Sequence, residues 1–137
     1  MVLSPAGEDL IEGFESLRLE AYKDLRGIWT IGFGHTGGVK EGDTCTKVQA
    51  DLWFMQDSQI AQATVNNSIK VPMKQNEFDA MVSLAYNIGA HAFANSEVVM
   101  HFNAGDQLGA ANAFLNWHTP NLMSRRVKER QFFLRAA

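Results

Sequence analysis

The chain has 137 residues, of which 46% are hydrophobic and 20% are charged. This composition is typical of one globular domain and excludes a disordered or collagen-like chain. The single cysteine, Cys45, excludes an internal disulfide bond, and no apolar run approaches the roughly 20 residues that a membrane span needs. The net charge of −3 disfavours a nucleic-acid-binding protein, which normally carries a basic surplus.

The N-terminal third begins with helix signals and then changes to strand signals. Ser4-Pro5 is typical of an N-cap followed by proline at the first helical position, and apolar residues at helical spacing predict a helix to about Phe14. After this helix large apolar residues alternate with small or polar ones. This alternation predicts two strands, the second over residues 29–34, with Gly27 in the turn between them.

The remainder of the chain is predicted to be helical. Thr46, with Gln49 three residues later, forms a capping box that opens a long helix, which ends before Val71-Pro72. Further helices are predicted at residues 75–88, from Ser96 to near Gly105, from Asp106 through Trp117, and from after Thr119-Pro120 to about Leu134.

These elements predict an α+β fold that is predominantly helical, with a small N-terminal β-hairpin region and a helical body. We expect residues 1–137 to form a single domain. A β-containing lobe is expected at about 15–60, and a helical lobe at about 70–137 together with the first helix. A substrate site is expected in the cleft between such parts.

Three polar residues in the β region form a pattern suited to glycoside hydrolysis. Glu15 stands at the end of the first helix, Asp24 follows nine residues later in the hairpin, and Thr30 lies six residues further on a strand. Cleavage of a glycosidic bond uses two carboxyl groups, and a hydroxyl group can orient a water molecule. Taken alone the spacing is not specific, because each residue is also ordinary at its position.

Longer blocks make the pattern specific. Residues 15–24 (ESLRLEAYKD) and 27–36 (GIWTIGFGHT) closely resemble the signature of phage lysozymes, glycoside hydrolase family 24. Residues 70–89 resemble the family's central helix, and the blocks 103–106 and 117–129 follow in the family's order. The resemblance extends over nearly the whole chain and implies a lysozyme-like fold.

The resemblance implies hydrolysis of the β-1,4 bond between N-acetylmuramic acid and N-acetylglucosamine in peptidoglycan. Glu15 matches the family's general acid, Asp24 the second carboxylate and Thr30 the water-orienting hydroxyl group. We expect inversion, in which the two carboxyl groups stand roughly 6.5–9.5 Å apart. To act as an acid Glu15 must keep its proton, so its partial burial is expected.

Five further residues receive roles from the same resemblance. Tyr86 and Asn87 match a substrate-facing pair, although a packed aromatic residue beside a helix-capping asparagine would also explain them. His35 is expected to hold the β region through a hydrogen bond. Either Arg125 or Arg126 is expected to pair with an acid near Glu15. The short segment 118–121, which is similar to the Thr-Pro-Asn turn of T-even phage lysozymes, leaves that choice open.

The C-terminal segment is basic, with Arg125, Arg126, Lys128, Arg130 and Arg135 against Glu129 alone, whereas residues 1–60 hold ten acids and five bases. The simpler interpretation is a solvated helix surface. The alternative is contact of this helix with an anionic membrane or wall polymer.

The expected partner is bacterial peptidoglycan, with no nucleic acid, and the protein is expected to be a monomer. Neither a metal nor a cofactor is expected, because Cys45 and the histidines lack ligand spacing. The N-terminus lacks the basic and apolar blocks of a secretory signal. We therefore expect an endolysin that accumulates in the host cytoplasm and reaches the wall through a holin.

Three alternatives remain open at the level of sequence. A lytic transglycosylase cuts the same bond without water, a virion-associated lysozyme acts during genome entry, and an inactive module only binds the wall. The presence of Glu15, Asp24 and Thr30 counts against the inactive module, and Asp24 with Thr30 favours hydrolysis.

Overall fold

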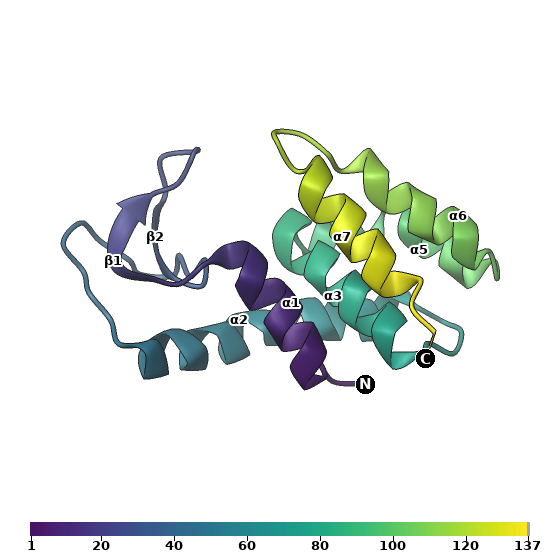
Figure 1. The fold of residues 1–137 in the computed structure, drawn as a ribbon, viewed down its shortest axis with the longest axis horizontal. Coiled ribbons are helices and arrows are strands. Elements are labelled where there is room, and N and C mark those ends of the chain that lie inside the picture. Colours follow the sequence, from purple (N-terminus) through teal and green to yellow (C-terminus); the bar gives the residue numbers. More distant parts are fainter. Residues whose placement is uncertain (137) are drawn as a thin grey trace. The chain divides into compact units, whose positions relative to one another are not determined.

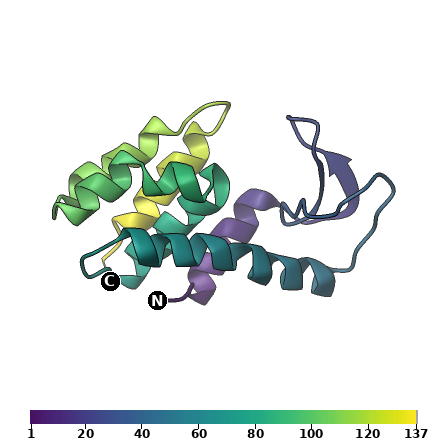
Figure 2. The same ribbon diagram turned by 180° about the vertical axis from the view of Figure 1, so that it is seen from behind.

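The computed structural model describes residues 1–136, which form two compact units. The β-containing unit comprises Asp9–Gln59, and the helical unit comprises residues 1–8 together with the chain from Ile60 onward. Helix α1 (Pro5–Glu15) and helix α2 (Lys47–Ser68) each contribute to both units. Figure 1 and Figure 2 show the course of the chain from two sides.

Helix α1 carries start and stop signals at its two ends. Its first turn is capped by Ser4, whose hydroxyl oxygen accepts from the Gly7 N–H at 3.1 Å and donates to the buried carboxylate of Asp79 at 2.5 Å. The helix ends at Glu15 because Ser16 adopts a φ of 53°, a left-handed conformation that cannot continue it. The predicted helix is therefore confirmed, with one more residue at its end.

Strands β1 (Arg18–Lys23) and β2 (Trp29–Gly32) form an antiparallel hairpin. The predicted hairpin is confirmed, but the second strand ends two residues earlier than expected. Gly32 and Gly34 adopt φ values of 67° and 83°, which bend the chain out of the ladder, so residues 33–34 form a turn.

The β-containing unit has a small apolar core. Ile11, Ile31, Phe33, Ala50 and Phe54 are buried, and the rings of Phe33 and Phe54 meet edge to face with centroids 6.2 Å apart. Helix α2 begins after Thr46, whose hydroxyl oxygen accepts from the Gln49 N–H at 3.1 Å.

The helical unit consists of short helices around one buried helix. Besides the start of α1 and the end of α2, its elements are α3 (Gln75–Ile88), α4 (Ala90–Ala94), α5 (Glu97–Asn103), α6 (Gln107–Ala113), a 3₁₀ turn η1 (Phe114–Asn116) and α7 (Met123–Phe133). Helix α3 is buried continuously over residues 77–85, and α7 packs along it (Figure 1). Phenylalanine rings from several helices fill the core, among them Phe78, Phe93, Phe102, Phe114 and Phe133.

Most helical predictions are confirmed. Helix α3 has the expected bounds, and Ser96 and Asp106 cap α5 and α6 by accepting from the N–H groups of Val99 and Gly109. Helix α4 was not expected, because five residues are too few to show helical periodicity. The helix predicted to run through Trp117 ends at Ala113, where the chain tightens into the 3₁₀ turn.

The architecture is the expected α+β fold, helical apart from one small sheet. Within residues 1–136, no helix combines the length and the apolar character required to cross a membrane.

Candidate active site

The carboxyl group of Glu15 lies against a glycine turn. Glu15 is the last residue of α1 and is partly buried. A Cβ atom added to Gly34 would lie 2.8 Å from Glu15 Oε2, well inside van der Waals contact. Gly34 also has a φ of 83°, a conformation that favours glycine. Gly34 therefore leaves the space that the Glu15 carboxyl group occupies, and sequence reasoning did not single it out.

Asp24 begins the turn between β1 and β2, where main-chain groups hold its side chain. Asp24 Oδ1 accepts from the N–H groups of Arg26 at 2.8 Å and Ile28 at 2.9 Å. Arg26 Nη2 lies 3.7 Å from the other carboxylate oxygen. The hydrogen bond from the Ile28 N–H is the main cause that lowers the pKa of Asp24 below its ordinary value. Asp24 is therefore a carboxylate at neutral pH.

Thr30 and Asp24 both form hydrogen bonds with the same turn residue, Ile28. Thr30 is buried on β2, and its Oγ1 lies 2.9 Å from the carbonyl oxygen of Ile28. Because a carbonyl oxygen only accepts, the Thr30 hydroxyl group donates its proton there. The hydroxyl oxygen is left with lone pairs, so Thr30 acts toward any further group as an acceptor. The same carbonyl oxygen accepts from the Asp24 N–H at 2.9 Å.

Tyr22 shares the electrostatic environment of both carboxyl groups. It pairs with Thr30 across the hairpin, and the guanidinium group of Arg18 lies 4.3 Å from its ring centroid. Burial raises the pKa of Tyr22, the charge of Arg18 opposes this shift, and the negative charges of Glu15 and Asp24 add to it. Sequence reasoning missed Tyr22, although the hairpin register counted outward from the turn would have placed it opposite Thr30.

His35 ties the glycine turn to helix α2. Its Nδ1 lies 2.8 Å from Asp57 Oδ2 and its Nε2 lies 3.0 Å from the carbonyl oxygen of Gly37. Both partner atoms belong to groups that accept hydrogen bonds, a side-chain carboxylate and a main-chain carbonyl. The ring also stacks on Trp53, with centroids 4.5 Å apart. Since His35 follows Gly34 directly, these contacts fix the turn against which Glu15 lies.

In the helical unit, Arg125 and Arg126 both bond to the carboxylate of Glu129 on their own helix. Arg126 and Glu129 are fully buried, and Arg125 is 9% exposed. Arg125 Nε lies 3.2 Å from Glu129 Oε2, and Arg126 Nη1 donates to Oε1. Ser83 of α3 donates its hydroxyl proton to the same carboxylate at 2.5 Å. Sequence reasoning did not select Glu129, although its spacing of three and four residues from the arginines places all three on one helix face.

Tyr86 and Asn87 lie near the end of α3 and are partly buried. Arg126 Nη2 donates to Asn87 Oδ1, so the asparagine side chain contacts α7. Gly89, with a φ of 94°, caps the helix through its N–H group, which donates to the Ala85 carbonyl oxygen at 2.9 Å.

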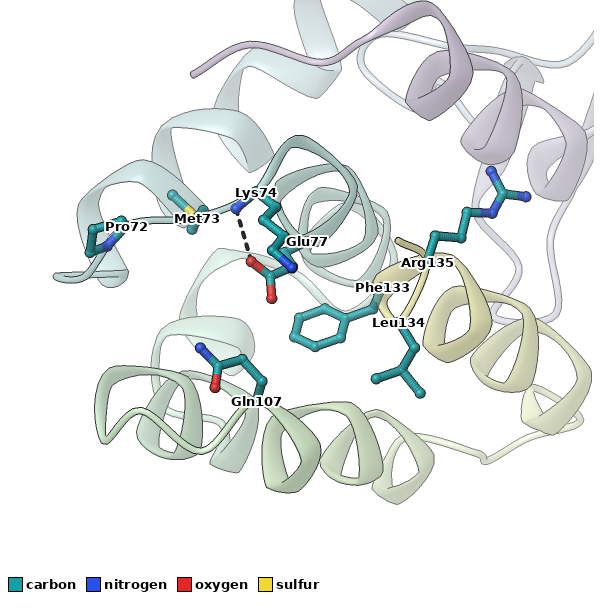
Figure 3. A pocket seen from close by; sticks show the side chains of 8 residues that line it. All are labelled: Pro72, Met73, Lys74, Glu77, Gln107, Phe133, Leu134 and Arg135. Atoms are coloured by element: carbon teal, nitrogen blue, oxygen red, sulfur yellow. Dashed lines mark hydrogen bonds between the residues drawn. The ribbon is translucent and has the colours of Figure 1, made fainter. Parts of the chain in front are cut away.

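The helical unit also contains a pocket of about 530 Å³. It is lined by Pro72, Met73, Lys74, Glu77, Gln107, Phe133, Leu134 and Arg135, none of which the sequence predicts as a site residue. Figure 3 shows the Glu77 carboxyl group and the Phe133 ring facing this space. The carboxyl group accepts from the Lys74 N–H at 2.8 Å, the contact of a helix cap. Glu77 therefore has a structural role at the start of α3.

The described residues hold no cluster of three or more histidine, cysteine, aspartate or glutamate side chains that is arranged to bind a metal ion.

Comparison with known proteins identifies relatives along the whole chain. The phage lysozyme family model matches residues 12–129. The endolysin of Acyrthosiphon pisum secondary endosymbiont phage 1 is 38% identical, over 97% of this chain and 98% of that protein.

Solved structures share the fold, among them an endolysin and a muramidase domain. The endolysin from Escherichia coli O157:H7 phage FAHEc1 has a TM-score of 0.94 and 40% identity, and the match covers 100% of this chain and 96% of that one. The muramidase domain of SpmX from Asticaccaulis excentricus has a TM-score of 0.93 and 37% identity, with 98% and 99% of the two chains covered. The chain therefore belongs to the phage lysozyme family and is a glycosidase that degrades peptidoglycan.

Proposed function

We propose that Glu15, Asp24 and Thr30 are the catalytic residues of this lysozyme. They hydrolyse the β-1,4 bond between N-acetylmuramic acid and N-acetylglucosamine, with inversion at the anomeric carbon. Glu15 gives its proton to the glycosidic oxygen as the bond from the anomeric carbon to that oxygen breaks. A water molecule attacks the anomeric carbon, and Asp24 accepts the proton that the water loses. Proton exchange with solvent then restores Glu15 and Asp24.

The hydrogen bond from Thr30 to Ile28 is the observation that carries this assignment. It leaves the Thr30 hydroxyl oxygen as an acceptor only, and the Asp24 carboxylate is also an acceptor. A water molecule bound to both groups donates both of its hydrogen atoms. Its lone pairs are then free to attack carbon, which is the geometry that an inverting glycosidase requires.

The surroundings of each group support its role. The pKa of Asp24 is lowered, so this group is ready to accept a proton from water near neutral pH. Glu15 is partly buried against Gly34, and His35 with Asp57 holds that turn. We further propose that Tyr86 and Asn87 bind the substrate, and that Arg125 and Arg126 support the site through Glu129.

Replacing Glu15 by glutamine tests the assignment. Glu15→Gln keeps the shape of the side chain but removes the transferable proton, so hydrolysis of purified peptidoglycan is expected to fall about 100- to 10,000-fold. The thermal unfolding transition should stay unchanged. Undiminished clearing by a folded Glu15→Gln protein would overturn the mechanism.

The stereochemical course tests inversion separately. Hydrolysis of a soluble peptidoglycan fragment, followed by proton NMR during the first minutes, should give the α-anomer at the new reducing end. A first-formed β-anomer would show retention and would remove the proposed role of the Asp24-bound water.

The route to the wall is proposed as holin-dependent release from the host cytoplasm, on the likeness to the relative named endolysin. Expression in bacteria should then leave cells intact until a holin is supplied. Lysis without a holin would contradict this route. We also propose that the enzyme acts as a monomer, which light scattering of the purified protein checks.

Contact of the C-terminal basic segment, which is α7 with Arg135 after it, with anionic wall or membrane polymers is proposed for the bases that are not buried. Arg125 and Arg126 are buried, which leaves Lys128, Arg130 and Arg135. Arg130 donates to Asn112 Oδ1 at 3.0 Å, and Arg135 lies over the Phe132 ring. Neutralising Arg130 and Arg135 should reduce the killing of intact cells more than the hydrolysis of isolated walls. Equal loss in both assays would contradict this contact.

A further inference from the structure

Arg126 is a buried cation whose three guanidinium nitrogens each donate to a different oxygen. Its side chain is fully buried. Nε donates to the Trp117 carbonyl oxygen at 2.7 Å, Nη1 to the Glu129 carboxylate and Nη2 to Asn87 Oδ1. Hydrogen bonds from a charged donor are stronger and more directional than neutral ones. Arg126 therefore links the end of α3 to α7 through a fixed planar group.

The chemistry of arginine determines which end of the Asn87 amide faces it. A guanidinium group has donors and no acceptor, so only the carbonyl oxygen of the amide can lie against it. The amide nitrogen of Asn87 then points away from Arg126. Within residues 1–136 this nitrogen donates to no acceptor, and Asn87 is partly exposed. Asn87 thus presents two N–H groups with one defined orientation.

Neighbouring contacts prevent Arg126 from turning. The Glu129 carboxylate, which holds Arg126, also accepts from the Ser83 hydroxyl group at 2.5 Å and from Arg125 Nε at 3.2 Å. Arg125 Nη2 in turn donates to the Ser83 carbonyl oxygen at 3.1 Å. Because these groups are buried, a rotation of Arg126 would leave charges without partners in a low-dielectric interior.

We propose that Arg126 is a positioning residue that makes Asn87 a hydrogen-bond donor toward a carbonyl oxygen of the peptidoglycan. The inference rests on the proposed role of Asn87 in substrate binding, and it specifies that Asn87 is the donor of the hydrogen bond. A substrate group that donates would meet the N–H groups of the Asn87 amide, because the Asn87 oxygen faces Arg126. The carbonyl oxygen belongs to an N-acetyl group of the glycan or to the stem peptide, and both present the same acceptor.

Equilibrium binding in the Glu15→Gln background tests this donor role without interference from hydrolysis. Asn87→Ala removes the donor, and Asn87→Asp keeps the shape and the contact with Arg126 but offers only acceptors. The Kd for soluble peptidoglycan fragments should rise about 3- to 10-fold with Asn87→Ala and at least 10-fold with Asn87→Asp. An unchanged Kd for both variants would overturn the proposal.

Asn112→Asp is the matched control. The oxygen of Asn112 also accepts from an arginine, with Arg130 Nε at 3.1 Å and Nη2 at 3.0 Å, but Asn112 is exposed. The substitution adds the same charge beside an arginine and should leave the Kd unchanged. An equal loss of affinity with Asn112→Asp would mean that net charge, and not the Asn87 donor, controls binding, which would overturn the proposal.

Two ligands distinguish the sources of the carbonyl oxygen. Loss of affinity for fragments with stem peptides and for the same glycan without peptides supports the N-acetyl group. Loss confined to the peptide-bearing fragments supports the stem peptide. Failure of Glu15→Gln to block hydrolysis would contradict the proposed catalytic mechanism, whereas the binding results judge the role of Asn87.

The role of Arg126 is tested by the energetic coupling between substitutions of Arg126 and Asn87. Arg126→Lys replaces the planar group by a single ammonium group and should loosen the amide, so Asn87→Ala should then cost less than half of its usual loss in affinity. A merely structural Arg126 would lower stability and leave the effect of Asn87→Ala unchanged, which would overturn the positioning role. If Arg126→Lys does not fold, NMR decides. The Asn87 side-chain amide signals of the Glu15→Gln protein should shift on addition of fragments, and their constancy would overturn the proposal.

Discussion

The two units hold their polar site residues in different ways. In the β-containing unit, Asp24 and Thr30 bond to main-chain groups of a short turn, and the Asp24 side chain is 25% exposed. In the helical unit, Arg126 and Glu129 bond to each other with no exposure to solvent. The first arrangement depends on backbone geometry, and the second depends on charge compensation. Substitutions in the β-containing unit should therefore change activity more than stability, and the reverse should hold for the buried ions.

The largest effect on stability is expected from Glu129→Gln. Removing the carboxylate leaves Arg125 and Arg126 buried without their common counter-ion, which should lower the free energy of unfolding by about 3 to 5 kcal/mol. Urea unfolding measures the loss. Asp51→Asn, in the exposed pair that Asp51 forms with Lys47, is the control and should have a much smaller effect. Equal effects would mean that burial of the ions does not matter.

The next effect concerns the glycine turn beside Glu15. Gly34→Ala adds a Cβ atom that would lie 2.8 Å from Glu15 Oε2, so the carboxyl group must move and hydrolysis should fall about 10- to 100-fold. Gly38→Ala is a matched control, because Gly38 also has a positive φ, 71°, but an added Cβ would meet nothing within 4 Å. Both variants should lose about 1 to 2 kcal/mol of stability from backbone strain. Similar activity in the two variants would show that the turn does not position Glu15.

The smallest effect is expected at the Asp24 carboxylate. Arg26→Ala removes an exposed cation that lies 3.7 Å from the carboxylate, so the pKa of Asp24 should rise but remain below the ordinary value, because the Ile28 N–H is the larger cause. Carbon-13 NMR titration of the Asp24 carboxyl group measures this pKa. Since the pKa is lower in the folded state than in the unfolded state, ionised Asp24 favours folding above the unfolded pKa. This contribution disappears as the pH falls through the folded pKa. A pKa at the ordinary value in Arg26→Ala would show that the main chain contributes little.

Much of the fold could be predicted because local signals agree with it. The Ser4, Ser96 and Asp106 caps each mark a helix start that the structure contains. The five-residue α4 carries no such periodic signal, and the end of β2 depends on glycine conformations that alternation of residue types does not reveal.

The residues of the candidate site also differ in whether a local sequence pattern reveals them. Glu15, Asp24 and Thr30 could be selected from motifs, because they lie at a helix end, a turn and a strand whose positions are local. Tyr22 and Glu129 were not selected, although the hairpin register and the helix spacing place them beside Thr30 and the two arginines. Gly34 could not be selected in this way, because its contact with Glu15 is made by folding and leaves no separate pattern in the chain.

The family, the kind of bond cleaved and the elements that carry the proposed catalytic groups could be predicted from the chain alone, since motifs and periodicity are properties of the chain. The hydrogen-bonding state of each group depends on contacts made in the folded protein. The Thr30 hydroxyl group became an acceptor through Ile28, and the Asn87 amide became a donor through Arg126. The physical reason is that a hydroxyl or amide group can donate or accept, and its partner in space selects between the two.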